Sequence, residues 1–284
     1  MVSSLEQSSS NARAELQRNA VLQLFRWKSA RRRALRTLGD IAPFLVLAVC
    51  WELASLFSKP FLIPGLDLIA VELWKILTTP EFLFAAAVTW LRLAGAVLAS
   101  VLIGVPIGIA MGFHPDLDRF IRPIIKFIMG VPALNWVIIV IIWFANTELR
   151  IAFVLIMLCT PVTIFCVYDG VRSIDRKLTD MVQGFGASGY QRIRYLIWPY
   201  VKAYVFTATK LNVGNAIRTV IVAELVGAPY GIGKELDEAK NIFNMPAVLA
   251  WTLLMVVLAL LMARALEHLE NRSLRWRDDN DEVH

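Results

Sequence analysis

Residues 180–199 read DMVQGFGASGYQRIRYLIWP, a polar and glycine-rich stretch that interrupts a strongly apolar sequence. On either side lie apolar runs at 150–170 and 201–226. Each run is long enough to cross about 30 Å of hydrocarbon as a helix. Of the 284 residues, 57% are hydrophobic and 18% are charged, which is unlike a soluble globular domain. The chain is therefore predicted to be an all-α, polytopic membrane protein in which 180–199 is an extramembrane loop.

Six segments are predicted to be transmembrane helices, because each is apolar over nearly the length that a bilayer requires. They lie near residues 41–58, 93–113, 127–145, 150–170, 201–226 and 246–266. The amphipathic segment 81–92 is expected to lead into the second span along the outer surface. Three prolines predict local kinks in the second, third and fourth spans: Pro106, Pro132 and Pro161.

Three regions follow from this pattern. Residues 1–40 form a basic N-terminal segment, 41–268 form the transmembrane domain with its loop at about 171–200, and 269–284 form a C-terminal tail. Apolar residues stand among the arginines of the N-terminal segment. Two interpretations stay open there, a helix on an anionic lipid surface and a loosely ordered tail.

The positions of Lys and Arg predict the orientation, because positive charge is retained on the cytoplasmic side of a membrane. With the N-terminus inside, the cytoplasmic segments are 1–40, 114–126, 171–202 and 264–284, and they hold 21 of the 29 Lys and Arg residues. Outer segments, in which Arg92 is counted, hold six. Both termini are therefore predicted to be cytoplasmic. The net charge of +6 then reflects membrane orientation and does not indicate nucleic-acid binding.

Sites for metal or for catalysis are not indicated by the sequence. The three cysteines, Cys50, Cys159 and Cys166, all lie in apolar runs and lack C-x-x-C spacing. The three histidines are scattered, and no Ser, His and Asp group suggests a nucleophile. The stretch GIGK at 231–234 lacks the glycine and the Ser or Thr that a phosphate-binding loop needs. No metal ligand or catalytic residue is predicted.

Small residues in the second span predict a close helix–helix contact. Gly104, Gly108 and Gly112 stand four positions apart, so they share one helix face. Small residues at this spacing let two helix backbones approach each other in a membrane. This face is predicted to be a packing seam.

The fifth span carries two polar faces, at about 100° per residue. The first face gathers a possible translocation path: Lys210, Gly214, Arg218 and Glu224. The second lies opposite: Asn212, Asn215 and Thr219. One face is expected to line a path and the other to pack on a neighbouring helix, since a helix that is polar on both sides cannot face lipid.

Two interpretations of the charges in this span stay open. If Lys210 and Arg218 face the path, they favour passage of an anion. Alternatively, Lys210 extends to the cytoplasmic surface and Arg218 is neutralised by a carboxylate such as Glu52 or Glu224.

The loop itself is predicted to form two short helices. The first begins at Arg176, glycines at 184 and 186 end it, and Ser188 is the N-cap of a second helix that Pro199 prevents from extending unchanged. An apolar stripe on the second helix would suit docking on another protein: Tyr190, Ile193, Leu196 and Ile197. The alternative from charge and helicity alone is an ordinary solvated connector.

The same loop resembles the cytoplasmic signature of the permease subunits of bacterial ATP-binding cassette (ABC) importers. That signature reads E-A-A-x-x-x-G, then nine residues, then I-x-L-P. Its glycine and its proline match in register, as Gly186 and Pro199. The other signature positions hold different residue types: Asp180, Met181, Val182, Leu196 and Trp198.

The resemblance extends over about residues 42–277. It is carried by WELAS (51–55), VPALNWVIIVIIWF (131–144), DGVRSID (169–175), VAELVGAPYGIG (222–233) and LEHLENRSLRW (266–276). These stretches are similar to permeases for nitrate, sulfonate, taurine or bicarbonate, and they imply the fold of a type I ABC importer permease.

In that family the loop is the coupling helix, which sits in a groove of a separate ATPase subunit. The resemblance implies that Gly186 lets the helix joint turn tightly against the ATPase. It assigns ATPase coupling to Asp180, Gly186, Ala187, Ser188, Tyr190, Arg192, Leu196 and Pro199. ATP and magnesium would be bound by the ATPase, so no cofactor is expected in this chain.

The resemblance also implies the partners and the location. We expect a homodimer in the bacterial inner membrane, two cytoplasmic ATPase subunits, and an external solute-binding protein near 59–80 and 228–244. The solute is expected to be small and anionic, although similar permeases carry uncharged pyrimidine precursors. Two alternatives are a secondary transporter driven by an ion gradient, for which no inverted repeat is found, and a membrane scaffold that does not transport.

Overall fold

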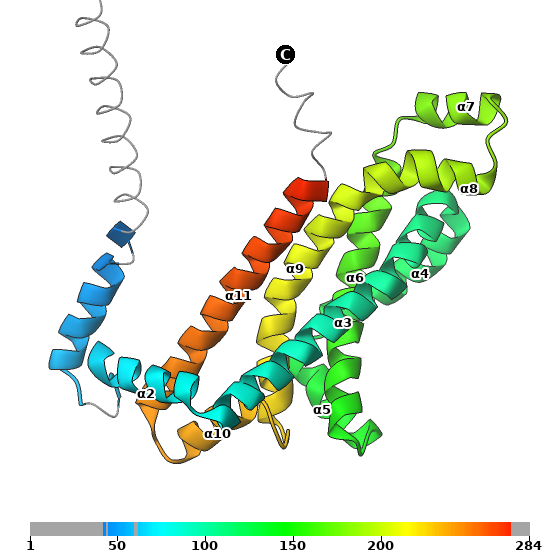
Figure 1. Cartoon of the computed structure of the whole chain (residues 1–284). Helices are drawn as coiled ribbons and strands as arrows, with labels where there is room; N and C mark the ends of the chain where they lie inside the picture. Colours follow the sequence, from blue (N-terminus) through cyan, green and yellow to red (C-terminus); the bar gives the residue numbers. More distant parts are fainter. Residues whose placement is uncertain (1–41, 44, 60–61, 274–284) are drawn as a thin grey trace, which may run out of the picture. The chain divides into compact units, whose positions relative to one another are not determined.

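The computed structural model describes residues 42–43, 45–59 and 62–273 (Figure 1). The described part is helical, with short loops and no strand. The predictions for the N-terminal segment 1–40 and for the tail beyond Ser273 lie outside the described residues. The all-α prediction is confirmed.

The chain divides into two units, Met1–Leu66 and Asp67–His284. In the first unit, the apolar helix Leu45–Leu56 is followed by a turn that folds back along it. Trp51 Nε1 donates to the Pro64 carbonyl at 3.0 Å, and the Leu66 N–H donates to Glu52 Oε2 at 3.0 Å. The Glu52 carboxylate therefore stabilises the turn within the first unit.

The second unit contains the remaining helices of the described chain. They are α2 (Leu66–Thr78), α3 (Pro80–Phe113), α4 (Pro115–Gly130), α5 (Ala133–Trp143), α6 (Thr147–Arg172), α7 (Arg176–Gly184), α8 (Gly189–Arg192), the π-helix η1 (Ile193–Ile197), α9 (Trp198–Leu225), α10 (Ile232–Asn241) and α11 (Met245–Ser273).

Three of the described helices are both long and apolar enough to cross a membrane, namely α3, α6 and α11. They contain the predicted second, fourth and sixth spans. The first predicted span is a shorter apolar helix, Leu45–Leu56. The fifth lies in α9, which has 28 residues but carries Lys210 and Arg218. A multi-pass membrane protein is thus shown, while the number six stays a prediction.

The third predicted span, 127–145, is not one helix. It is divided between α4 and α5, which meet at an angle of 98°. Val131 and Pro132 between them are extended, with ψ of 127° and 140°. Proline lacks an N–H and disfavours helix in the residue before it, so it breaks the helix here instead of only kinking it. Pro106 and Pro161, by contrast, lie inside the unbroken helices α3 and α6.

The helix that contains the second predicted span starts before that span. Segment 81–92 is continuous with it, and α3 runs for 34 residues from Pro80. Arg92 therefore lies inside a helix and does not belong to an outer loop.

The helices α3 and α6 pack closely along the three predicted glycines. A Cβ at Gly104 would lie 2.7 Å from Thr163 Cβ, and one at Gly108 would lie 2.8 Å from the Ile164 carbonyl oxygen. At Gly112 the nearest atom would be Val171 Cγ1, at 2.5 Å. Any side chain would force the two backbones apart, so all three glycines lie in this helix contact.

The core of the second unit lies between α3, α6 and α9. Buried polar groups join the three helices at mid-length, because Asn212 Nδ2 donates to Thr163 Oγ1 at 2.8 Å and to Ser100 Oγ at 3.3 Å. Asn212 and Thr219 are buried, while Asn215 is exposed. The second polar face of α9 is therefore mostly its packing face.

Candidate functional site

The joint between α7 and α8 depends on Gly186. This residue has φ of +69°, a left-handed conformation that glycine adopts without the strain of a side chain. The Gly186 N–H donates to the Gln183 carbonyl at 2.9 Å, and the Ala187 N–H donates to the Val182 carbonyl at 3.3 Å. This pair of bonds is a Schellman motif with glycine at the position that requires it. Gly186 thus ends α7 and reverses the chain.

The second helix of the loop begins with a capping box. Ser188 Oγ accepts from the Gln191 N–H at 3.3 Å, and Gln191 Oε1 accepts from the Ser188 N–H at 2.8 Å. Asp175 caps α7 in the same way, accepting from the Lys177 N–H at 2.9 Å. Both helices of the loop therefore have defined starts.

Helical hydrogen bonding does not stop at Pro199. After α8 the chain passes through the π-helical turn η1 and directly into α9, with Pro199 in the first turn of α9. A proline is tolerated in a first turn because its missing N–H would be unpaired there. The loop is consequently joined to the fifth predicted span without a break, from Gly189 to Leu225.

The base of the loop is anchored in the core. Ile197 and Val201 are buried against Val167 and Val171 of α6. Leu196 is also buried. Tyr190 and Ile193, in contrast, are 75% and 45% exposed. The predicted stripe is therefore wrong as a single docking surface, because the π-helical turn shifts its second half toward the core.

Several large apolar side chains of the loop are exposed, and two of them, Tyr190 and Ile193, belong to that stripe. They come from α7, the joint, α8 and η1: Met181, Phe185, Tyr190, Ile193 and Tyr195. Exposed large apolar side chains concentrated in one short segment are typical of an interaction site.

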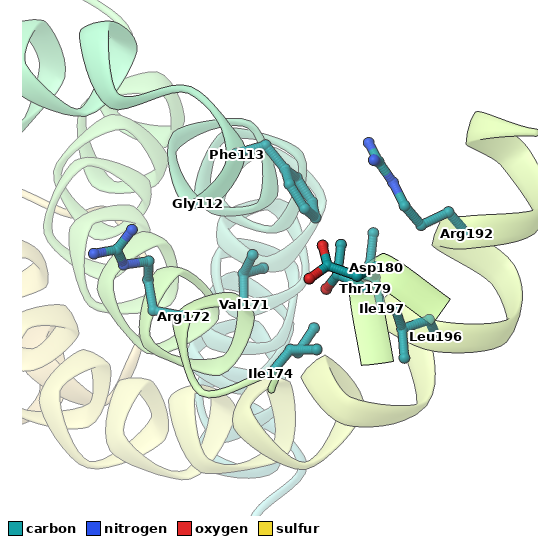
Figure 2. A pocket seen from close by; sticks show the side chains of 10 residues that line it. All are labelled: Gly112, Phe113, Val171, Arg172, Ile174, Thr179, Asp180, Arg192, Leu196 and Ile197. Carbon is teal, nitrogen blue, oxygen red and sulfur yellow. The ribbon is translucent and has the colours of Figure 1, made fainter. Parts of the chain in front are cut away.

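A cavity of about 310 Å³ lies behind the loop. Figure 2 shows the Phe113 ring at the end of α3 facing Thr179 and Asp180 of α7, with Leu196 and Ile197 of η1 on the other side. The Arg192 guanidinium lies 5.0 Å from the centre of the Phe113 ring, within the range of a cation–π contact. Asp180 and Arg192 thus line one cavity, although they come from different helices of the loop.

The residues proposed for the path on α9 separate into two groups. Gly214 and Arg218 are exposed, and a Cβ at Gly214 would meet no described atom within 4 Å. Lys210 is half-buried and pairs with Glu270 of α11. Glu224 is fully buried. Gly214 and Arg218 therefore lie on the exposed face of α9, whereas Glu224 does not.

Glu224 has partners that the sequence did not suggest. Its Oε1 accepts from Arg92 Nη1 of α3 at 2.7 Å. Arg92 Nε also donates to Glu148 Oε2 of α6 at 2.9 Å. The expectation that Glu224 neutralises Arg218 is wrong, because Arg92 occupies that carboxylate. Glu52, the other carboxylate considered, holds the Leu66 N–H in its own unit.

Sequence reasoning missed Arg92 and Glu148. Both had a usable signal, since each stands within or beside an apolar run where an unpaired charge is costly. Pairing them with Glu224 required the tertiary structure, because the three residues are far apart in the sequence.

Among the residues that the structure describes, no group of three or more His, Cys, Asp or Glu side chains could hold a metal ion. The described chain also contains a loop with capped helices and exposed apolar side chains, and a helix, α9, that connects this loop to the opposite end of the core.

Comparison with known proteins gives a family match. Residues 104–275 match the model of the binding-protein-dependent transport system inner membrane component family.

Full-length relatives are similar over most of the chain. The taurine transport system permease protein TauC of Escherichia coli K12 is 28% identical, over 90% of this chain and 94% of its own length. The formylaminopyrimidine transport permease protein ThiX of Halalkalibacterium halodurans is 25% identical, over 87% and 98%. The putative aliphatic sulfonates transport permease protein SsuC of Bacillus subtilis is 24% identical, over 89% and 92%.

Solved structures share the fold. A chain of the inward-facing MetNI methionine ABC transporter superposes with a TM-score of 0.57 at 17% identity, covering 70% of this chain and 98% of that one. A chain of a bacterial alginate ABC transporter, solved with an alginate pentasaccharide-bound periplasmic protein, has a TM-score of 0.55 at 13% identity, covering 85% and 97%.

Proposed function

The chain belongs to the family of binding-protein-dependent transport system inner membrane components, and on this premise we propose that it forms the solute path of an importer driven by a separate cytoplasmic ATPase. The observation that carries the proposal is the α7–α8 loop. It has a glycine-dependent reversal, two capped helices, exposed apolar side chains, and an unbroken helical connection to α9.

The loop is suited to receive force from a partner protein. Its caps and its Schellman motif fix its shape before docking, which lowers the entropy lost on binding. Exposed groups such as Phe185 and Tyr190 offer apolar area to a groove. ATP and magnesium would reside in that partner and not in this chain.

The transported solute is proposed to be a small anion, such as a sulfonate. Two named relatives, for taurine and for aliphatic sulfonates, support this class. The exposed Arg218 on α9 adds a positive charge suited to an anion. Two copies of the chain would face each other across the path, and an external binding protein would deliver the solute.

The test compares two glycines of the loop. Gly186→Trp should abolish stoichiometric recovery of the ATPase with the tagged chain and stop ATP-driven uptake, because a side chain at this positive φ strains the joint and the indole would project into the open space where the partner is proposed to dock. Gly184→Ala is the control, since Gly184 has the same open space as Gly186 but no positive φ, and it should behave as the wild type does. Recovery is measured by affinity purification in mild detergent and mass spectrometry.

Either of two results would count against the proposal. Normal ATPase recovery and normal uptake with Gly186→Trp would show that the loop does not couple the chain to the ATPase. A purified wild-type chain that recovers no ATPase and still takes up solute along an ion gradient would instead establish a secondary transporter.

A further inference from the structure

The end of α9 far from the loop carries a buried carboxylate with several partners. The Glu224 side chain is 0% exposed. It accepts hydrogen bonds from Arg92 Nη1 at 2.7 Å, from Thr89 Oγ1 at 2.9 Å and from the Gly233 N–H at 2.9 Å. Its donors lie on α3 and at the start of α10, so this single side chain joins three helices.

The arginine in this cluster links it to further elements. Arg92, with a side chain 7% exposed, also donates from Nη1 to the Tyr230 carbonyl at 2.8 Å. Its other contact, with Glu148, reaches the first turn of α6. A buried ion pair repays its desolvation only when further hydrogen bonds satisfy both partners, and here they do.

Glycines allow the chain before α10 to close over Glu224. A Cβ at Gly231 would lie 2.5 Å from Glu224 Cδ, and one at Gly233 would lie 2.5 Å from Glu224 Cβ and 2.6 Å from the Ile221 carbonyl oxygen. Gly231 also has φ of +130°. The Ile232 N–H donates to Thr89 Oγ1 at 2.9 Å. The start of α10 is therefore seated directly on the cluster.

The rest of α10 makes its polar contacts mainly within itself. Lys234 pairs with Glu235 at 3.1 Å and Glu238 at 2.9 Å, and Lys240 pairs with Asp237 at 2.6 Å. Ile232 and Leu236 are buried on its other side. Its polar attachment to the helices beneath is thus concentrated at Glu224 and Thr89, and Arg92 in turn binds Glu224.

The other end of α9 continues into the docking loop. α9 has 28 residues, about 42 Å at 1.5 Å per residue, and η1 joins it to α8 without a break. A displacement of the loop would therefore be applied to one end of a helix whose other end holds α10.

We propose that the Arg92–Glu224 pair, with Thr89, is the joint that makes α10 follow α9, so that nucleotide-driven movement of the α7–α8 loop reaches the opposite surface of the membrane. This inference rests on the proposed function, because it requires an ATPase on the loop. Arg92, Thr89 and Glu224 are positioning residues here, and α10 is the element that they position.

The experiment reads the movement of α10 directly and needs no knowledge of the solute. Asn241, exposed at the end of α10, is changed to cysteine after the three native cysteines are replaced by alanine. The purified complex with its ATPase is labelled with a maleimide, with and without a non-hydrolysable ATP analogue. Nucleotide should change the labelling rate at least threefold when Glu224 is intact.

Two variants remove different contacts of the Arg92–Glu224–Thr89 cluster, and a third variant serves as the control. Glu224→Gln removes the charge that holds Arg92, and Thr89→Val removes the hydroxyl that bridges to Ile232. In both, the labelling rate should no longer respond to nucleotide. Glu148→Gln removes only the 58% exposed partner of Arg92, so the response should persist.

Three outcomes decide the question. If the Glu224→Gln and Thr89→Val complexes assemble and their labelling rate responds to nucleotide as in the wild type, the proposal that this cluster makes α10 follow α9 is wrong. Failure of both variants to assemble, when Glu148→Gln assembles, would also overturn it, because the cluster would then serve folding alone. A wild-type chain that recovers no ATPase contradicts the proposed function itself, and this is read before any variant.

Discussion

At the scale of single residues, Lys210 and Arg218, two of the cations of α9, have different surroundings. Lys210 is paired with Glu270 of α11. Arg218 lies on the exposed face beside Gly214 and makes none of the ion pairs found in the described chain. Neutralising Lys210 would leave a half-buried carboxylate behind, whereas neutralising Arg218 would remove a charge from an open surface. Of these two, Arg218 is the one open to an anion on the proposed path.

If the solute is an anionic sulfonate, as proposed, Arg218→Gln should raise the KM for its import about tenfold, which corresponds to about 1.4 kcal/mol of lost binding. The physical reason is loss of a cation at the surface that the solute passes. Arg218→Lys keeps the charge and should stay within about threefold of the wild type. Uptake of a labelled alkanesulfonate into proteoliposomes measures both. An unchanged KM in Arg218→Gln would place Arg218 away from the path.

The parts of the site that could be predicted were those encoded locally. Gly186, Ser188 and Pro199 occupy backbone positions that only certain residue types fill well, so sequence spacing was enough to locate them. The Arg92–Glu224 pair joins residues 132 positions apart, and no periodicity links them. Helical angles alone placed Glu224 on the face of Arg218. They cannot show which neighbouring helix a residue at the edge of a face will contact.

At the scale of elements, the contact of α3 with α6 depends on glycine at specific turns. A Cβ added at Gly108 would lie 2.8 Å from the Ile164 carbonyl oxygen, whereas a Cβ added at Gly95, on the same helix, would have no described atom within 4 Å. The two glycines share a helix and differ in whether another helix lies against them. They therefore form a matched pair for testing this packing.

Gly108→Ala should destabilise the protein by about 1–3 kcal/mol, the usual cost of overpacking a close contact. Gly95→Ala should be neutral or stabilising by up to about 1 kcal/mol, because alanine favours helix over glycine. Thermal unfolding of the purified protein in one detergent compares the two. A Gly108→Ala variant that unfolds at or above the wild-type temperature would contradict the close contact.

Helix positions were predictable where apolar length decides them and not where proline or charge intervenes. The spans in α3, α6 and α11 follow from runs of apolar residues. The 98° bend between α4 and α5 does not, since Pro132 is compatible with either a kink or a complete break. The π-helical turn η1 was also out of reach, because no residue type specifies a single wider turn.

At the scale of the whole molecule, one helix of the second unit joins the two features on which the proposals rest. The α7–α8 loop stands at the start of α9, and the cluster under α10 stands at its end. If α9 crosses the bilayer once, these ends must lie on opposite sides of it. The distribution of Lys and Arg then predicts which side each takes.

Thiol labelling in whole cells tests this orientation. In the chain without native cysteines, Asn241→Cys should react with an impermeant maleimide in intact cells. Gln191→Cys, exposed in α8, should react only after permeabilisation, since segment 171–202 is rich in Lys and Arg and is retained inside. Permeabilised cells, in which both should react, control for accessibility. Labelling of Gln191→Cys in intact cells would reverse the orientation, and a cytoplasmic ATPase could then not reach the loop.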